Sequence, residues 1–74
     1  MTPPPRDVLD CRGQRCPLPV IALARQIGRI PVGATVTVLA DDPAAANDIA
    51  AWCRMTGQRL VTSDATAFTV ERLS

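Results

Sequence analysis

The residues of this chain best suited to chemistry form the short motif Cys16-Pro17-Leu18-Pro19. An apolar run at helical spacing follows the motif, over residues 20–27. Proline is tolerated in the first turn of a helix, and Pro17 also disfavours the α conformation for the residue before it. The pattern therefore predicts a helix that begins at Pro17, with Cys16 as its N-cap residue.

A thiol at a helix N-terminus would face free backbone N–H groups and the positive end of the helix dipole. Such surroundings stabilise the thiolate, which is the reactive form of cysteine. We therefore expect the pKa of Cys16 to lie below its ordinary value. Arg12 and Arg15, in the loop before Cys16, would lower this pKa further, and Gly13 permits a tight turn there.

The other two cysteines are predicted to be structural. Cys53 continues the apolar stripe of a second predicted helix at helical spacing, so we expect it to pack in the core. Cys11 shares strand parity with Leu9 and should also face the core. A redox disulfide between Cys11 and Cys16 stays open as an alternative, although the spacing is not C-x-x-C.

The residue types that are missing narrow the chemistry of Cys16. The chain has no histidine, which removes the ordinary Cys-His dyad of acyl transfer. Its three cysteines, spread over different elements, do not form a zinc pattern. The pair Asp41-Asp42 could suggest magnesium, but Asp42 is explained as a helix cap. What remains is exchange between sulfur atoms, in which Cys16 attacks a terminal persulfide and holds the sulfur as Cys16–S–SH, with no cofactor.

The elements that must position Cys16 follow from periodicity and turn residues. We expect strands at residues 8–11, 34–40, 59–63 and 67–73, and helices at residues 17–29 and 43–56. The order βαβαββ predicts an α+β fold, a two-layer sandwich with two helices on one face of a four-stranded mixed sheet. The predicted buried stripes of the helices are Val20, Leu23, Ala24 and Ile27, and then Ala46, Ile49, Ala50 and Cys53.

Length and composition limit the number of domains and the kinds of partner. The 74 residues suffice for one domain, at residues 7–74, after a disordered proline-rich tail at residues 1–6. A net charge of +1 and only two aromatic residues argue against a direct nucleic-acid partner. No signal peptide or transmembrane stretch is visible, so we expect no membrane association. Unpaired thiols indicate a reducing cytoplasm. Because no large apolar face remains unaccounted for, we expect a monomer.

Beyond these local patterns, the chain from Val8 onward resembles the TusA/SirA family of sulfur carriers. The residues that carry the resemblance are Asp10-x-Arg12-Gly13-x-x-Cys16-Pro17-x-Pro19, Asp41-Asp42-Pro43-x-Ala45, Asp48-Ile49, Trp52-Cys53 and Gly57. Departures from the family pattern are Gln14, Leu18 and Gln58-Arg59.

The resemblance implies a βαβαββ sandwich similar to the C-terminal domain of translation initiation factor 3. It also implies a sulfurtransferase in which Cys16 carries persulfide sulfur. The donor would be a cysteine desulfurase or a rhodanese-like protein. The acceptor would be a relay protein for tRNA thiolation, molybdenum-cofactor biosynthesis or sulfur oxidation.

Two other hypotheses remain at this point. One is a non-catalytic regulatory or RNA-associated binding module with a redox-sensitive thiol, and the other is a redox switch that joins Cys11 to Cys16. For the carrier hypothesis, Arg12, Gly13, Arg15, Pro17 and Pro19 are the expected supporting residues, as support for the thiolate or for partner docking. Arg25 is a further candidate for partner docking.

Overall fold

The computed structural model describes residues 7–74, so the tail predicted at residues 1–6 lies outside the described residues. The elements are β1 (Asp7–Asp10), α1 (Leu18–Ile27), β2 (Thr35–Leu39), α2 (Ala45–Thr56), β3 (Arg59–Ser63) and β4 (Ala67–Glu71). The predicted order βαβαββ is confirmed, with element ends that differ from the predictions by at most two residues.

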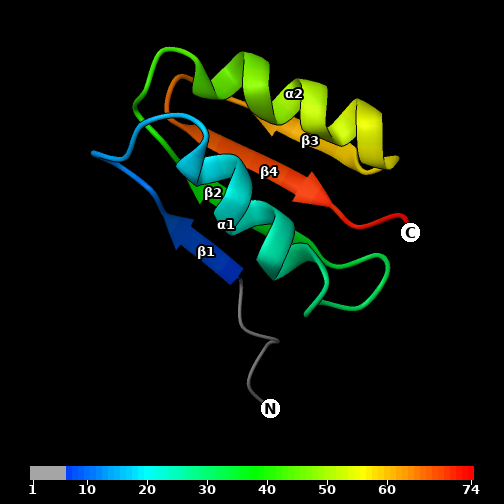
Figure 1. Ribbon diagram of the computed structural model, residues 1–74. Coiled ribbons are helices and arrows are strands. Elements are labelled where there is room, and N and C mark those ends of the chain that lie inside the picture. Colours follow the sequence, from blue (N-terminus) through cyan, green and yellow to red (C-terminus); the bar gives the residue numbers. More distant parts are fainter. Residues whose placement is uncertain (1–6) are drawn as a thin grey trace.

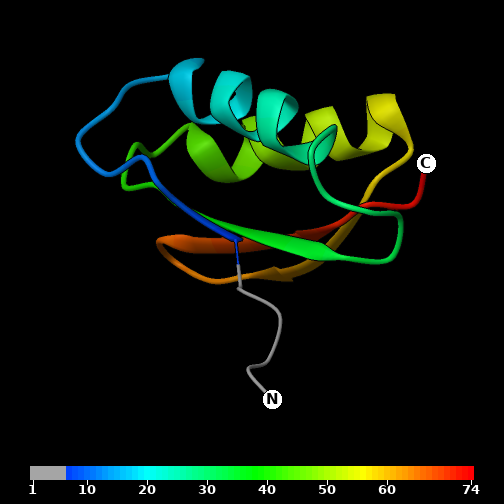
Figure 2. The same ribbon diagram turned by 90° about the horizontal axis from the view of Figure 1, so that it is seen from below.

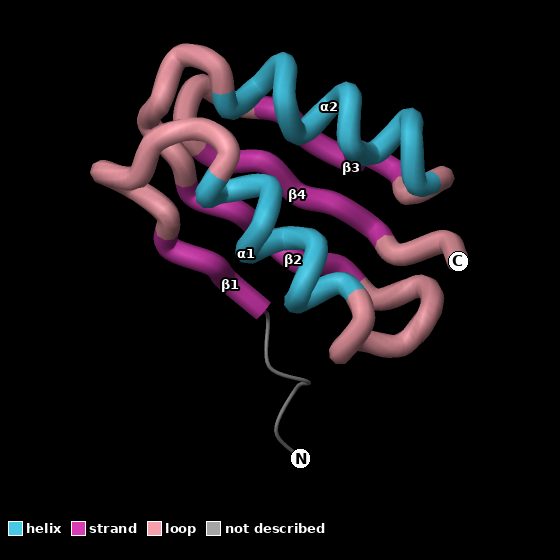
Figure 3. Tube along the Cα trace, in the orientation of Figure 1, coloured by secondary structure: helices cyan, strands magenta, loops and turns pink. Residues whose placement is uncertain are grey.

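The four strands form one mixed sheet in the order β1-β2-β4-β3. β1 pairs with β2 in parallel, whereas β4 is antiparallel to both β2 and β3 (Figure 1). Both helices cover the same face of this sheet, as Figure 2 shows from below, and the tube in Figure 3 shows them running over the strands. The two-layer α+β architecture is therefore as predicted.

The core lies between the sheet and the helices, and the two central strands, β2 and β4, supply its central side chains. In β2 the buried residues Val36 and Val38 alternate with more exposed threonines, as a strand covered on one face requires. They pair across the ladder with Val70 and Phe68 of β4, which are also buried. Burial of each such side chain contributes about 1.5–3 kcal/mol.

The buried rows of both helices are narrower than the sequence predicts. α1 buries Pro19, Leu23 and Ile27, and α2 buries Ala45, Ile49 and Cys53. Each buried row repeats every four residues. Ala24 and Ala46 directly follow buried residues in the sequence and lie outside these rows. Ala24 and Ala46, predicted to be buried, are therefore exposed.

No helix among residues 7–74 is long and apolar enough to cross a membrane.

α2 ends at Gly57, which adopts a left-handed conformation with φ +76°. Its N–H donates to the carbonyl oxygen of Cys53, which closes the helix as the sequence predicts. A Cβ at position 57 would meet only the Ser74 hydroxyl oxygen, at 3.9 Å, so backbone conformation and not space requires glycine here.

We therefore expect Gly57→Ala to lower the free energy of unfolding by about 1–2 kcal/mol, the cost of a left-handed alanine. Gly28 is the matched control, because its φ of −74° suits any residue. Gly28→Ala should leave stability unchanged or raise it by about 0.4–1 kcal/mol. Equilibrium urea denaturation followed by Trp52 fluorescence measures both. Equal effects of the two substitutions would contradict this account of the α2 terminus.

Candidate active site around Cys16

Two loops meet at one end of the sheet and form the site. Because β1 and β2 are parallel, their carboxyl ends lie at the same edge. The loop after β1, residues 11–17, therefore lies beside the loop after β2, residues 40–44, at the same end of the molecule in Figures 1 and 2. The first of these, which we call the cysteine loop, carries Cys16.

Two carboxylates of the second loop hold the cysteine loop by its backbone. The N–H of Gly13 donates to Asp41 Oδ1 at 2.9 Å, and the N–H of Cys16 donates to Asp42 Oδ2 at 3.2 Å. The other oxygen of Asp42 accepts the N–H of Ala44 at 2.8 Å. Asp42 was predicted as the N-cap of α2, but that position belongs to Ala44, and Asp42 instead joins the two loops.

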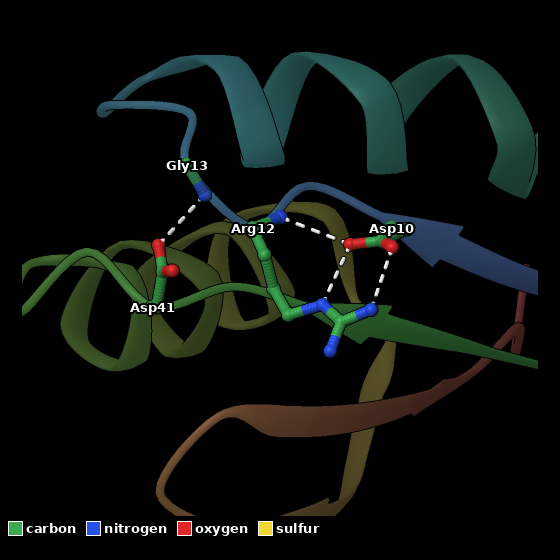
Figure 4. A network of polar contacts seen from close by, with 4 residues as sticks. All are labelled: Asp10, Arg12, Gly13 and Asp41. Atoms are coloured by element: carbon green, nitrogen blue, oxygen red, sulfur yellow. Dashed lines mark hydrogen bonds and ion pairs between the residues drawn. The ribbon is translucent and has the colours of Figure 1, made fainter.

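Gly13 has a structural role in this arrangement. Its φ of +81° lies in the left-handed region, and a Cβ at this position would meet no atom within 4 Å. The glycine is therefore required by the turn that aims its N–H at Asp41 (Figure 4) and not by close packing.

Arg12 is engaged with Asp10 and not with the thiol. Its guanidinium makes two parallel hydrogen bonds to the Asp10 carboxylate, at 2.9 and 2.8 Å, and its backbone N–H makes a third at 3.2 Å (Figure 4). These hydrogen bonds lower the pKa of Asp10 to about 2. Both side chains are more than half exposed, so solvent screens the ion pair, and its hydrogen bonds shape the start of the cysteine loop.

Cys16 was predicted to be the N-cap of α1, but it lies one residue before that position. α1 begins at Leu18, its N-cap is Pro17, and the peptide bond between Cys16 and Pro17 is cis. The thiol of Cys16 does not point to a backbone N–H group of the helix. Instead, it donates its hydrogen to Oδ2 of Asp48, in the first turn of α2.

The predicted lowering of the Cys16 pKa is therefore wrong. The hydrogen bond from the thiol to Asp48 raises the pKa of Cys16, since it stabilises the protonated form. Desolvation and the negative charges of Asp48 and Asp42 act in the same direction. The hydrogen bonds from the N–H groups of Ala44 and Cys16 lower the pKa of Asp42, and the positive charge of Arg15 acts there in the same direction.

Cys16 and Asp48 lie on the wall of an open pocket between the two helices. Its volume is about 250 Å³, and its lining residues are Cys16, Pro17, Val20, Asp48, Ala51, Trp52 and Met55. Apart from Cys16 and Asp48, this lining is apolar. Met55 is 82% exposed, so the pocket opens to solvent beside the thiol.

The remaining predicted residues have other positions. Pro19 lies in the first turn of α1, on its buried face, while Arg25 lies in the last turn of α1, at the end away from Cys16. Cys11 and Cys53 are buried as predicted, and burial raises the pKa of both thiols. All three cysteines are free, and Cys16 alone is exposed.

Asp48 is the site residue that the sequence analysis missed, although it belongs to the family motif. The signal was available in the spacing of Asp48, Trp52 and Met55, which at four and three residues share one face of α2. Asp48 is the single acidic residue of that helix. A lone carboxylate within an otherwise apolar face indicates a partner on a neighbouring element.

Among residues 7–74, no group of three or more side chains could hold a metal ion.

Because the pKa values of two carboxyl groups are lowered, the free energy of unfolding depends on pH in the acidic range. Asp10 and Asp42 titrate in the folded state below their unfolded value of about 3.9. Their stabilisation is thus complete above that value and is lost as the pH falls through the folded pKa. We expect the unfolding free energy to fall between about pH 4 and pH 2, and to fall less steeply in Asp10→Asn and Asp42→Asn.

Urea denaturation at a series of pH values tests this expectation. Asp64→Asn is the control, because this carboxylate in the turn between β3 and β4 accepts the N–H of its neighbour Ala65 and holds neither loop; it should follow the wild-type curve more closely. Parallel curves for all four proteins would contradict the role given to the two carboxylates.

A comparison with known protein families agrees with this geometry. The family model described as Sulfurtransferase TusA matches residues 7–72, which include both loops, the pocket and every strand and helix.

Proposed function

The chain belongs to the TusA sulfurtransferase family, and on that basis we propose that it is a sulfur carrier that acts through Cys16. In this proposal Cys16 accepts sulfane sulfur as a persulfide and passes it to an acceptor protein. The observation that carries the proposal is the position of Cys16, the one exposed cysteine, at an open apolar pocket.

Loading needs only a nucleophile, access and a leaving group. The Cys16 thiolate attacks the terminal sulfur of a donor persulfide, a new S–S bond forms on Cys16, and the old S–S bond breaks. The donor thiolate leaves and takes up the proton that Cys16 releases. Atoms and electrons balance without an oxidant or a metal, so the sulfur is held covalently and no cofactor is required.

The apolar pocket supports this role in two ways. Its volume exceeds that of one sulfur atom, so it has room for the loaded sulfur together with a side chain of the partner. Its lining by Val20, Trp52 and Met55 keeps water from part of the reacting group. Sulfur donors and acceptors would reach Cys16 from the solvent side, where the exposed Arg15 could contribute to docking.

For the partners, we propose a cysteine desulfurase or a rhodanese-like protein as donor and a relay protein as acceptor. The route would lead to tRNA thiolation, molybdenum-cofactor biosynthesis or sulfur metabolism. Three free cysteines suit a reducing compartment such as the cytoplasm.

The alternative of an RNA-associated module has less support. Of the two aromatic residues, Phe68 is fully buried and Trp52 lines the pocket, which leaves no aromatic platform for stacking bases on the sheet. The redox-switch alternative would have to expose Cys11, which is 3% accessible and packed in the core.

The test is the intact mass of the protein after incubation with a cysteine desulfurase and cysteine. We expect the wild type to gain one sulfur atom, removable by dithiothreitol. Cys16→Ser should gain none, because it lacks the attacking sulfur, whereas the matched control Cys11→Ser should load like the wild type.

A rhodanese with thiosulfate and inorganic polysulfide are the second and third donors to try. Absence of sulfur on the wild type with all three, or equal loading of Cys16→Ser, would contradict the carrier proposal.

A further inference from the structure

We infer that Asp48 is a positioning residue of the carrier: its carboxylate holds the sulfur-free thiol of Cys16 and so favours release of sulfur. The inference rests on the proposed function, since it compares the empty and the loaded state of the same cysteine. It goes beyond the proposed function by stating that the transfer equilibrium favours release of sulfur from Cys16.

Two independent contacts fix Cys16 in the empty state. Asp42 accepts its backbone N–H from the loop after β2, and Asp48 of α2 accepts the hydrogen of its thiol. Asp48 is half-buried, with its neighbours Ala51 and Trp52 on the same pocket wall. A carboxylate in such partly apolar surroundings gains more from a hydrogen bond than it would in water.

The charged groups around the thiol all favour its protonated form. From α2 the facing charge is Asp48, and from the loop after β2 it is Asp42. Arg12 is occupied by Asp10, and Arg15 acts on Asp42. The single charged residue of α1, Arg25, lies at the far end of that helix. These surroundings agree with the raised pKa of Cys16.

Loading Cys16 changes this balance. A persulfide anion has no hydrogen to donate to Asp48, and its terminal sulfur carries negative charge about 2 Å beyond Sγ. The anion is therefore repelled by the carboxylate that stabilised the thiol. Asp48 thus lowers the free energy of the empty state relative to the loaded state.

Release restores the hydrogen bond. The thiolate of an acceptor attacks the terminal sulfur, an S–S bond forms on the acceptor, and the S–S bond on Cys16 breaks. The sulfur of Cys16 leaves as a thiolate, takes up the proton of the acceptor thiol and again donates to Asp48. No oxidant or reductant is consumed, so Asp48 affects the equilibrium of the transfer without changing its stoichiometry.

Three variants separate charge from structure. Asp48→Asn keeps the size and the acceptor oxygen but removes the charge. Asp48→Ala removes both and suits the interior of a helix, so it serves if the amide variant folds poorly. Asp64→Asn removes a carboxylate whose hydrogen bond is to the N–H of Ala65 in its own turn, and it is the matched control. Circular dichroism establishes that each variant is folded.

The first measurement is the pH profile of iodoacetamide alkylation at Cys16, followed by peptide mass spectrometry. We expect the profiles of both Asp48 variants to shift to lower pH. At neutral pH their alkylation should be about three- to tenfold faster than in the wild type, since the thiolate fraction rises more than its nucleophilicity falls. Asp64→Asn should follow the wild type.

The second measurement is the loaded fraction of Cys16 in a fixed mixture of glutathione persulfide and glutathione. The ratio of loaded to empty protein should rise about three- to tenfold in Asp48→Asn. Unchanged alkylation profiles and unchanged ratios in both Asp48 variants would overturn the inference. Failure of the wild type to load at all would instead contradict the proposed function, and with it the release step.

Discussion

The hydrogen bonds that join the cysteine loop to the loop after β2 are the interaction on which the site depends. Parallel pairing of β1 and β2 brings both loops to one edge of the sheet. Asp41 and Asp42 then accept the N–H groups of Gly13 and Cys16, which are otherwise unpaired backbone donors of an irregular loop. Because Asp42 also accepts the N–H of Ala44, the same carboxylate fixes the cysteine and the approach to α2.

These hydrogen bonds between the two loops place the Cys16 thiol where the helix layer meets solvent. The helices pack on the sheet through narrow rows of buried residues, and their outward faces leave the pocket between them. Cys16 lies at that pocket because it is held from two sides, by Asp42 of the loop after β2 and by Asp48 of α2. A carrier must be accessible to a donor and an acceptor in turn, and an open pocket on a rigid scaffold meets that need.

Much of the fold could be predicted from local sequence. Alternation in β2, the left-handed Gly57 and the prolines at the start of α1 each indicate the local conformation, and the structure agrees with each of them. Ala24 and Ala46 were assigned to the wrong face. Alanine is small enough to suit either side of a helix, so it does not show where the buried stripe ends.

The environment of Cys16 could not be predicted in the same way. Its pKa depends on Asp48, which is 32 residues away in the sequence and reaches the thiol only after α2 has packed beside α1. Local reasoning counted the helix dipole and two arginines, and it missed that Arg12 pairs with Asp10. The exposure of Cys16 was predictable, whereas the sign of its electrostatic surroundings required the tertiary structure.

One measurement tests most directly whether Cys16 holds sulfur that it can give up. The wild-type protein is loaded with heavy-isotope sulfur, separated from the donor and mixed with cyanide, which takes sulfane sulfur as thiocyanate. We predict the label on the peptide that contains Cys16, followed by its stoichiometric recovery as labelled thiocyanate. Label on Cys11 or Cys53, or label on Cys16 that cyanide does not remove, would contradict the account.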